Sequence, residues 1–154
     1  PWGRPDMALF KFTEAIINGS PIEVYDEGNH QRDFTYIDDI VKSIIKLIQL
    51  PPPKKSSSYN TSKPDGSYSN APWRIYNIGN NETISLTKFI KIIEEELGKK
   101  AKKKFLGMQL GDVKKSYSST RRLKKITGFK PYTPLKKGIK EFIKWYKDYY
   151  NISS

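Results

Sequence analysis

The alternation of helical and extended segments is the feature of this sequence that most constrains its fold. Apolar residues recur at the spacing of an amphipathic helix in several stretches, and short apolar runs lie between them. This pattern predicts helices over 6–18, 38–50, 86–97 and 119–126, and a final helix that begins at Thr133-Pro134. It predicts extended segments over 21–25, 32–37, 74–79 and 103–106. Helices that alternate with single strands are typical of the α/β class.

Two stretches between these elements carry further information. Residues 51–74 are rich in Ser, Pro, Lys, Asn and Gly, which predicts a long exposed loop. The apolar run at 74–79 is typical of a strand in a covered parallel sheet. No other predicted strand of comparable length is available to pair with it. We therefore expect it to add to the edge of a sheet whose remaining strands lie upstream.

Composition excludes several classes of site. With no Cys and a single His, His30, the chain has neither a disulfide framework nor a thiolate or histidine zinc site. No apolar run approaches the roughly 18 residues that span a membrane, so we expect no membrane association. A core of one domain fits the length of 154 residues.

The net charge of +12 is concentrated in one part of the chain. Residues 99–147 hold 17 Lys and Arg against two acids, whereas residues 1–98 are nearly balanced. Such asymmetry can mark a nucleic-acid surface. However, 23 of the 28 basic residues are Lys, and Arg is the residue expected where phosphates are held by paired hydrogen bonds. A solvated basic face is the interpretation we favour, and a nucleic-acid-binding module remains the alternative.

Two motifs near the start carry a family resemblance. They are residues 3–12, Gly-Arg-Pro-Asp-Met-Ala-Leu-Phe-Lys-Phe, and residues 32–40, Arg-Asp-Phe-Thr-Tyr-Ile-Asp-Asp-Ile. Together they resemble the C-terminal half of a nucleotide-sugar epimerase of the extended short-chain dehydrogenase/reductase group, with UDP-glucuronate 4-epimerases as the nearest branch. The resemblance covers essentially the whole chain. It implies that residues 1–154 are the substrate-binding part of an extended Rossmann-type α/β epimerase, without its N-terminal dinucleotide-binding half.

The resemblance assigns roles to two arginines. Arg4 matches a residue that holds the sugar carboxylate, and a guanidinium can donate two parallel hydrogen bonds to such a group. Arg32 matches a residue that binds the nucleotide diphosphate. Taken as residues alone, Arg4 could be an ordinary loop residue, and Arg32 could pair with Asp33 or Asp38.

The remaining expected contacts follow the same resemblance. Tyr25 matches an aromatic residue that stacks on uracil, while the backbone near Glu23 reads the base edge, and Leu9 matches a backbone contact to the nucleotide. Asp112, in a Gly-Asp turn, matches the acceptor for the ribose hydroxyls, and Gln109 matches a position typical of the glucuronate branch. A tyrosine on a strand is also commonly a core residue, and a Gly-Asp pair is common in loops.

We therefore expect the chain to supply only the substrate-binding part of a larger enzyme. A complete enzyme of this kind is cytoplasmic, uses bound NAD and interconverts UDP-glucuronate and UDP-galacturonate at C4. The sequence has no Gly-rich dinucleotide fingerprint and, on our interpretation, no catalytic Tyr-x-x-x-Lys. We expect both to come from another segment, the missing half being a possible partner, and we expect this chain alone to hold no NAD and to be inactive. A third interpretation, besides the epimerase part and the nucleic-acid-binding module, is that the chain is an inactive remnant of a split gene.

Overall fold

The computed structural model describes residues 4–51, 62, 66–69 and 71–152, and these form two compact units. The first unit comprises Pro1–Phe34, Glu82–Tyr117 and Thr133–Ser154. The second comprises Thr35–Asn81 and Ser118–Tyr132. The two units are described separately below.

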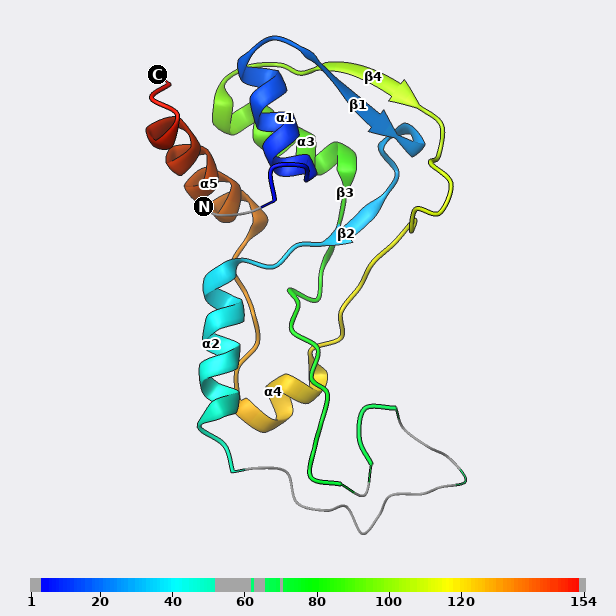
Figure 1. The fold of residues 1–154 in the computed structure, drawn as a ribbon, viewed down its shortest axis with the longest axis vertical. Coiled ribbons are helices and arrows are strands. Elements are labelled where there is room, and N and C mark those ends of the chain that lie inside the picture. Colours follow the sequence, from blue (N-terminus) through cyan, green and yellow to red (C-terminus); the bar gives the residue numbers. More distant parts are fainter. Residues whose placement is uncertain (1–3, 52–61, 63–65, 70, 153–154) are drawn as a thin grey trace. The chain divides into compact units, whose positions relative to one another are not determined.

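The first unit contains three longer helices and two pairs of strands (Figure 1). Its helices are α1 (Ala8–Ile17), α3 (Leu86–Leu97) and α5 (Leu135–Tyr149). Strand β1 (Pro21–Tyr25) pairs in parallel with β4 (Lys102–Leu106), and β2 (Gln31–Asp33) pairs antiparallel with β3 (Thr83–Ser85). A single 3-10 turn, η1 (Asp26–Gly28), joins β1 to the segment that leads into β2.

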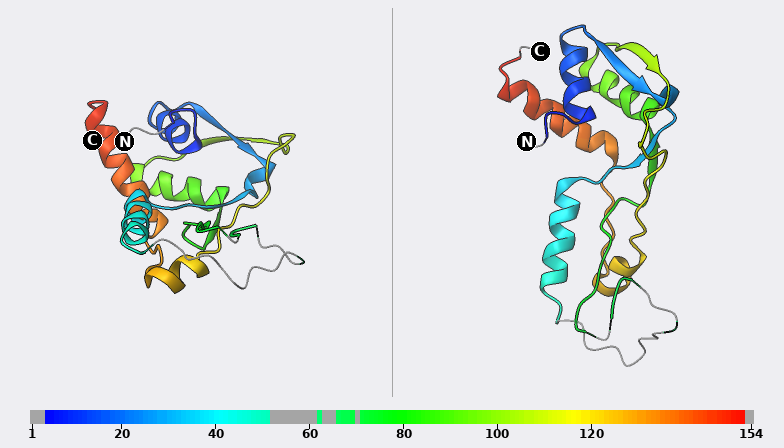
Figure 2. Two further views of the ribbon diagram at one scale, coloured as in Figure 1. Left: turned by 60° about the horizontal axis from the view of Figure 1, so that its bottom comes forward. Right: turned by 45° about the vertical axis from the view of Figure 1, so that its right-hand side comes forward.

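An apolar core holds the first unit together. In both views of Figure 2, α1 and α3 lie side by side against β1 and β4. The ring of Phe34 stacks on that of Phe89, with centroids 4.6 Å apart. The core residues from these elements are Phe12, Ile16, Ile22, Val24, Phe89, Ile90, Ile93, Ile139 and Ile143. Burial of these nine side chains supplies the main favourable free energy for folding of this unit.

Local sequence explains the ends of α3. The Ser85 hydroxyl accepts a hydrogen bond from the Lys88 backbone N–H at 3.2 Å, and Gly98 ends the helix at φ +66°. A serine at the N-cap and a left-handed glycine after the last turn are typical helix ends, and they fit the predicted helix over 86–97. Gly28 in η1 has φ +79°, and a Cβ there would collide with the Thr87 side chain. A glycine is therefore required where η1 approaches the start of α3.

The second unit contains α2 (Ile37–Ile48) and α4 (Arg121–Thr127), which contact each other. Its interior contacts are largely polar: Asp39 and Ser43 are buried, and the Ser43 hydroxyl donates to the Asp39 carbonyl at 2.7 Å. Asp39 Oδ2 accepts a hydrogen bond from the Tyr132 backbone N–H at 3.1 Å. Among the described residues of this unit, the large apolar side chains that are fully buried are those of Leu123 and Pro131. The unit has far less apolar core than the first.

The structure corrects parts of the sequence prediction. No strand forms over 74–79; Arg74 makes one isolated bridge to Tyr68, and the Ile75 N–H donates to the Ser67 carbonyl. A strand needs a hydrogen-bonded neighbour, and the neighbour expected for 74–79 was an upstream strand, so its addition to a sheet edge stays a prediction. The predicted extended segment 32–37 is shorter, since α2 begins at Ile37. Pro134 precedes α5 as its N-cap and does not occupy its first helical position.

The remaining predictions concern the other helices, the long loop and membrane-spanning segments. The other predicted helices are present within a few residues of their expected ends. The proposed loop at 51–74 falls mostly outside the described residues, and so stays a prediction. Among the described residues, no helix is long and apolar enough to cross a membrane.

Candidate functional site

The centre of the candidate site is strand β2, which brings distant segments of the first unit together. The Gln31 N–H donates to the Lys114 carbonyl at 2.8 Å, and the Ser116 N–H donates to the Gln31 carbonyl at 3.0 Å. On its other edge, β2 pairs with β3. The segment that follows β4 is thereby held beside β2, and this pairing sets the position of Asp112.

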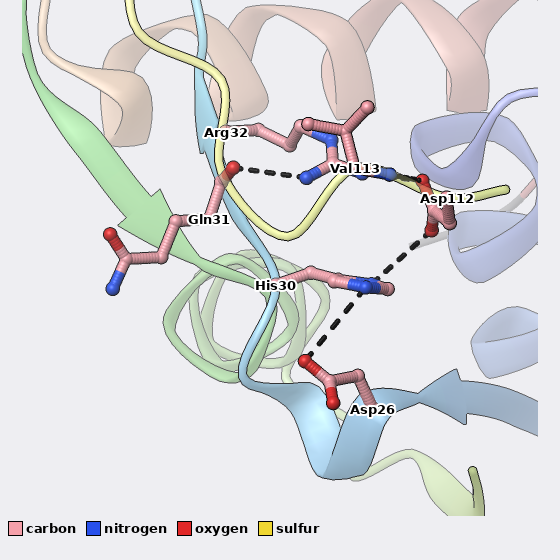
Figure 3. Close-up of polar contacts among 6 residues, drawn as sticks. All are labelled: Asp26, His30, Gln31, Arg32, Asp112 and Val113. Carbon is pink, nitrogen blue, oxygen red and sulfur yellow. Dashed lines mark hydrogen bonds and ion pairs between the residues drawn. The ribbon is translucent and has the colours of Figure 1, made fainter. Parts of the chain in front are cut away.

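Arg32 and Asp112 form an ion pair across 80 positions of sequence (Figure 3). Arg32 Nη2 donates to Asp112 Oδ1 at 2.8 Å, and Arg32 Nη1 donates to the Gln31 carbonyl at 3.0 Å. Both side chains remain about one-third exposed. Two residues expected from the resemblance to contact one nucleotide are thus adjacent. The described ion pair of Arg32 is with Asp112, a partner that the sequence did not suggest.

Asp112 occupies a tight turn. Its backbone N–H donates to the Gln109 carbonyl at 3.2 Å, and Gly111 adopts φ +82°. Asp112 Oδ1 also accepts from the Val113 N–H at 2.8 Å. The Gln109 side chain is exposed, so its expected contact with substrate stays a prediction.

His30 and Asp26 complete the cluster, and sequence reasoning missed both. The imidazole of His30 lies between two carboxylates, with Nδ1 3.4 Å from Asp112 Oδ2 and Nε2 3.8 Å from Asp26 Oδ2. Figure 3 shows the ring pointing between these two acids. His30 is almost fully buried. The sequence signal was available, because the only histidine lies four residues after Asp26 and two before Arg32.

Tyr25 and Glu23 lie on β1. The Tyr25 hydroxyl donates to Glu23 Oε2 at 2.9 Å, and this hydrogen bond, with the negative charge of Glu23, raises the pKa of Tyr25. The Tyr25 side chain is half-buried and Glu23 is exposed. Their expected contacts with a base stay predictions.

Arg4 and Leu9 lie near the start of α1. Arg4 is exposed and forms a two-pronged contact with Asp6, a hydrogen-bonded pair that lowers the pKa of Asp6 and raises that of Arg4. Leu9 packs against the apolar core. Neither belongs to the contacts around β2 reported above, and their expected roles stay predictions.

The Tyr-x-x-x-Lys spacing occurs twice in the chain, which corrects the sequence interpretation. The first instance, Tyr59 and Lys63, lies outside the described residues. In the second, Tyr132 precedes Pro134 and Lys136 lies in the first turn of α5. A catalytic pair of this spacing needs both side chains on one face of one helix. Tyr132 is not helical, so this second pair does not meet that requirement.

The described residues show neither a glycine-rich dinucleotide turn nor a cluster of metal ligands. A dinucleotide is commonly bound by closely spaced glycines at a helix N-terminus. The left-handed glycines Gly19, Gly98 and Gly128 instead follow the C-terminal ends of helices. In the part of the chain that the structure describes, no group of three His, Cys, Asp or Glu residues could hold a metal ion. No chemical step through NAD is therefore assigned to these residues.

The basic segment is partly neutralised by α3. Lys103 Nζ contacts buried Glu94 at 2.7 Å, and Lys136 Nζ contacts Glu95 at 3.2 Å. Lys99 Nζ donates to the Ile17 carbonyl at 3.2 Å. These lysines have structural partners, which weakens the case for a dedicated nucleic-acid surface.

Comparison with known proteins finds relatives of this chain. Residues 1–62 match the NAD dependent epimerase/dehydratase family. The chain is 46% identical over 150 residues to Protein CapI of Staphylococcus aureus, covering 97% of this chain and 45% of that protein. It is 43% identical over 150 residues to a probable UDP-glucuronate 4-epimerase of Rhizobium meliloti (strain 1021), covering 97% of this chain and 44% of that protein. The chain thus spans less than half the length of these relatives.

A solved structure shows the same fold. The UDP-glucuronic acid 4-epimerase from Bacillus cereus, in complex with UDP-glucuronic acid and NAD, matches with a TM-score of 0.78 and 25% identity. The match covers 97% of this chain and 42% of that one. The α/β arrangement described above is therefore part of an extended Rossmann-type epimerase fold. By sequence and by fold, the chain is similar to part of proteins of the NAD dependent epimerase/dehydratase family.

Proposed function

We propose that these residues form the nucleotide-sugar-binding part of an NAD-dependent epimerase that interconverts UDP-glucuronate and UDP-galacturonate at C4. The observation that carries the proposal is the meeting of Arg32 and Asp112 at 2.8 Å beside β2. A guanidinium next to a partly exposed carboxylate offers both a donor for phosphate and an acceptor for hydroxyls. Similarity to a probable UDP-glucuronate 4-epimerase along nearly the whole chain supports this substrate class.

Each proposed contact uses a different chemistry. Arg32 binds the diphosphate, and Asp112 accepts hydrogen bonds from the ribose hydroxyls. Arg4 releases its contact with Asp6 and binds the sugar carboxylate instead. Tyr25 stacks on the uracil, with Glu23 and Leu9 contributing backbone contacts and Gln109 a polar contact at the loop. The hydride-transfer cofactor, the catalytic Tyr and Lys, and the Gly-rich turn come from polypeptide outside these 154 residues. This chain alone binds substrate weakly and turns nothing over.

The partner in this proposal is the nucleotide-binding half, and it covers an apolar stripe on α2. The stripe consists of Ile37, Val41, Ile44, Ile45 and Ile48, which share one face of the helix and are all exposed, Ile48 by 76%. On the opposite side, α2 buries Asp39 and Ser43. A helix that exposes its isoleucines and buries its polar residues within its own unit needs an apolar surface from elsewhere. More than half the length of the relatives has no counterpart in this chain, which supplies a candidate for that surface.

The test is turnover and binding by the full-length protein. We expect UDP-glucuronate to be converted to UDP-galacturonate, detected by ion-exchange chromatography, and UDP to bind in calorimetry. Arg32→Ala should weaken UDP binding about tenfold or more, because a charge-assisted contact to phosphate is lost. The control Arg121→Ala removes an exposed arginine from α4 and should leave binding unchanged. Absence of UDP binding, with salt-sensitive DNA binding in its place, would support the nucleic-acid alternative.

A further inference from the structure

His30 has no part in the contacts proposed above, yet it is the only histidine of the chain and is 5% exposed. Its carbonyl accepts a hydrogen bond from the Leu86 N–H at 2.8 Å, at the start of α3. The next residue, Gln31, begins β2. Anchored on both sides, His30 has little freedom to move its ring. A buried polar ring in such a place calls for an explanation.

The two ring nitrogens face different carboxylates. Nδ1 lies 3.4 Å from Asp112 Oδ2, and Nε2 lies 3.8 Å from Asp26 Oδ2 and has no hydrogen-bond partner. A neutral imidazole carries a proton on one nitrogen only. Because the Asp112 carboxylate is the nearer, we expect the proton of the neutral ring on Nδ1.

Asp112 is held on both of its oxygens. Oδ1 already accepts two hydrogen bonds, one from Arg32 and one from the Val113 N–H. Each carboxylate oxygen has about two acceptor sites. Oδ1 is therefore filled, whereas Oδ2 lies 3.4 Å from His30 Nδ1 and keeps acceptor capacity. That oxygen is the one able to accept from a ligand hydroxyl.

The loop that carries Asp112 depends on these contacts. Residues 107–111 are all exposed, and Leu110 is fully so. Without His30, the carboxylate could still pivot about its Arg32 and Val113 contacts through Oδ1. The contact of His30 with Oδ2 removes that freedom.

We infer that His30 is a positioning residue that orients the Asp112 carboxylate, so that one acceptor site of Oδ2 faces the nucleotide. This inference rests on the proposed function, since it concerns how the same site presents Asp112 to a ribose hydroxyl. His30 touches no substrate in this arrangement. It acts through Asp112 alone.

The first test needs no ligand. In the full-length protein, ¹⁵N NMR of the imidazole reports which nitrogen carries the proton, and loss of the signal in His30→Gln assigns it. We expect the Nδ1–H form for the neutral ring, and a change to the Nε2–H form in Asp112→Ala. Asp26→Ala should leave the Nδ1–H form in place. An unchanged tautomer in Asp112→Ala would overturn the inference.

The second test is a double-mutant cycle on UDP affinity, measured by calorimetry in the full-length protein. His30→Gln should weaken UDP binding by about three- to tenfold. The same change should have no further effect in the Asp112→Ala background. The control Asn29→Ala, at an exposed neighbouring position, should leave affinity unchanged. Equal losses from His30→Gln in both backgrounds would contradict a role through Asp112.

The two tests separate this inference from the proposed function. If the wild-type protein binds no UDP, the proposed function fails, while the NMR tautomer still reports on the His30–Asp112 contact. If UDP binds and the tautomer of His30 is the same in wild type and in Asp112→Ala, only the inference about His30 fails. Thermal unfolding of each variant identifies those that lose affinity by unfolding.

Discussion

The two units of the chain bury different kinds of side chain. The first unit closes over a continuous set of Ile, Phe and Val residues from α1, β1, α3 and α5. The second buries Asp39, Ser43 and Thr120, and the fully buried large apolar residues among those described are Leu123 and Pro131. Ile37, Ile44, Ile45 and Ile48 on α2 lie at the surface. Since apolar burial is the main favourable contribution to folding, the first unit has its own source of stability. For the second unit we proposed an apolar surface supplied by the nucleotide-binding half.

The largest effect should come from charging the stripe of α2. We expect the double variant Ile44→Asp and Ile48→Asp to weaken association with the nucleotide-binding half by at least a hundredfold. Each isoleucine buried there contributes about 1.5–3 kcal/mol, and each new charge opposes burial. Pull-down or calorimetry with the two halves produced separately measures the loss. Lys42→Asp, a charge change at another exposed position of α2, is the control and should bind normally. Unchanged binding by the double variant would mean that the stripe is not covered by this partner.

The next largest effect concerns the core of the first unit. Ile90 is fully buried on α3, so Ile90→Ala should lower the free energy of unfolding by about 2–5 kcal/mol. Urea denaturation followed by tryptophan fluorescence measures this difference. The matched change Ile45→Ala, at an exposed position of α2, should cost under about 0.5 kcal/mol in the 154-residue chain. Similar costs for both variants would remove the distinction between the two units.

A smaller effect should follow from the buried carboxylate of Glu94. Its Oε1 accepts from the Ala101 N–H at 2.9 Å and from Lys103 Nζ at 2.7 Å. Burial alone raises the pKa of Glu94, but these hydrogen bonds and the charges of Lys103 and Lys100 outweigh it, so its pKa lies below the ordinary value. The stabilisation is therefore present above the unfolded-state pKa of about 4.3 and is lost as pH falls through the folded-state pKa.

Glu94→Gln tests this assignment. The variant should be about 1–2 kcal/mol less stable than wild type at pH 7, because a charge-assisted bond becomes a neutral one. The difference should shrink below pH 4, where the wild-type carboxyl also becomes neutral. Urea denaturation at the two pH values measures it, with Glu95→Gln, whose side chain is more exposed, as the control. A difference that does not depend on pH would exclude the ionised carboxylate as its source.

Sequence patterns were sufficient for the local elements of the fold. Helical periodicity located α1, α2, α3 and α5, because spacing of apolar residues and capping groups act within a few residues. Residues 74–79 form no paired strand within this chain, because pairing depends on a neighbour, and the expected neighbour was an upstream strand. The parallel pairing of β1 with β4 was likewise not foreseen, although both segments were recognised as extended.

The candidate site was only partly accessible from sequence. The resemblance singled out Arg32 and Asp112 separately, but their contact depends on the register by which Gln31 binds Lys114 and Ser116. His30 and Asp26 were missed for the same reason, since their importance lies in their distance from Asp112. Arg4, Leu9, Glu23, Tyr25 and Gln109 keep the roles that the resemblance suggested as predictions.

The smallest effect on stability should come from the Arg4–Asp6 pair, which contrasts with Arg32–Asp112. Both groups of the first pair are exposed, by 73% and 55%. Arg4 lowers the pKa of Asp6 mainly through their hydrogen bond, so any stabilisation would be present above the unfolded-state pKa of Asp and lost as pH falls. Solvent and salt screen such a pair, and its two side chains lose conformational freedom on pairing. Asp6→Asn should therefore leave the thermal midpoint unchanged within error, at low and at high salt, whereas Asp112→Asn should lower it measurably. A clear drop in Asp6→Asn that disappears at high salt would show that this pair stabilises the start of α1, and that Arg4 is less available for a substrate carboxylate than proposed.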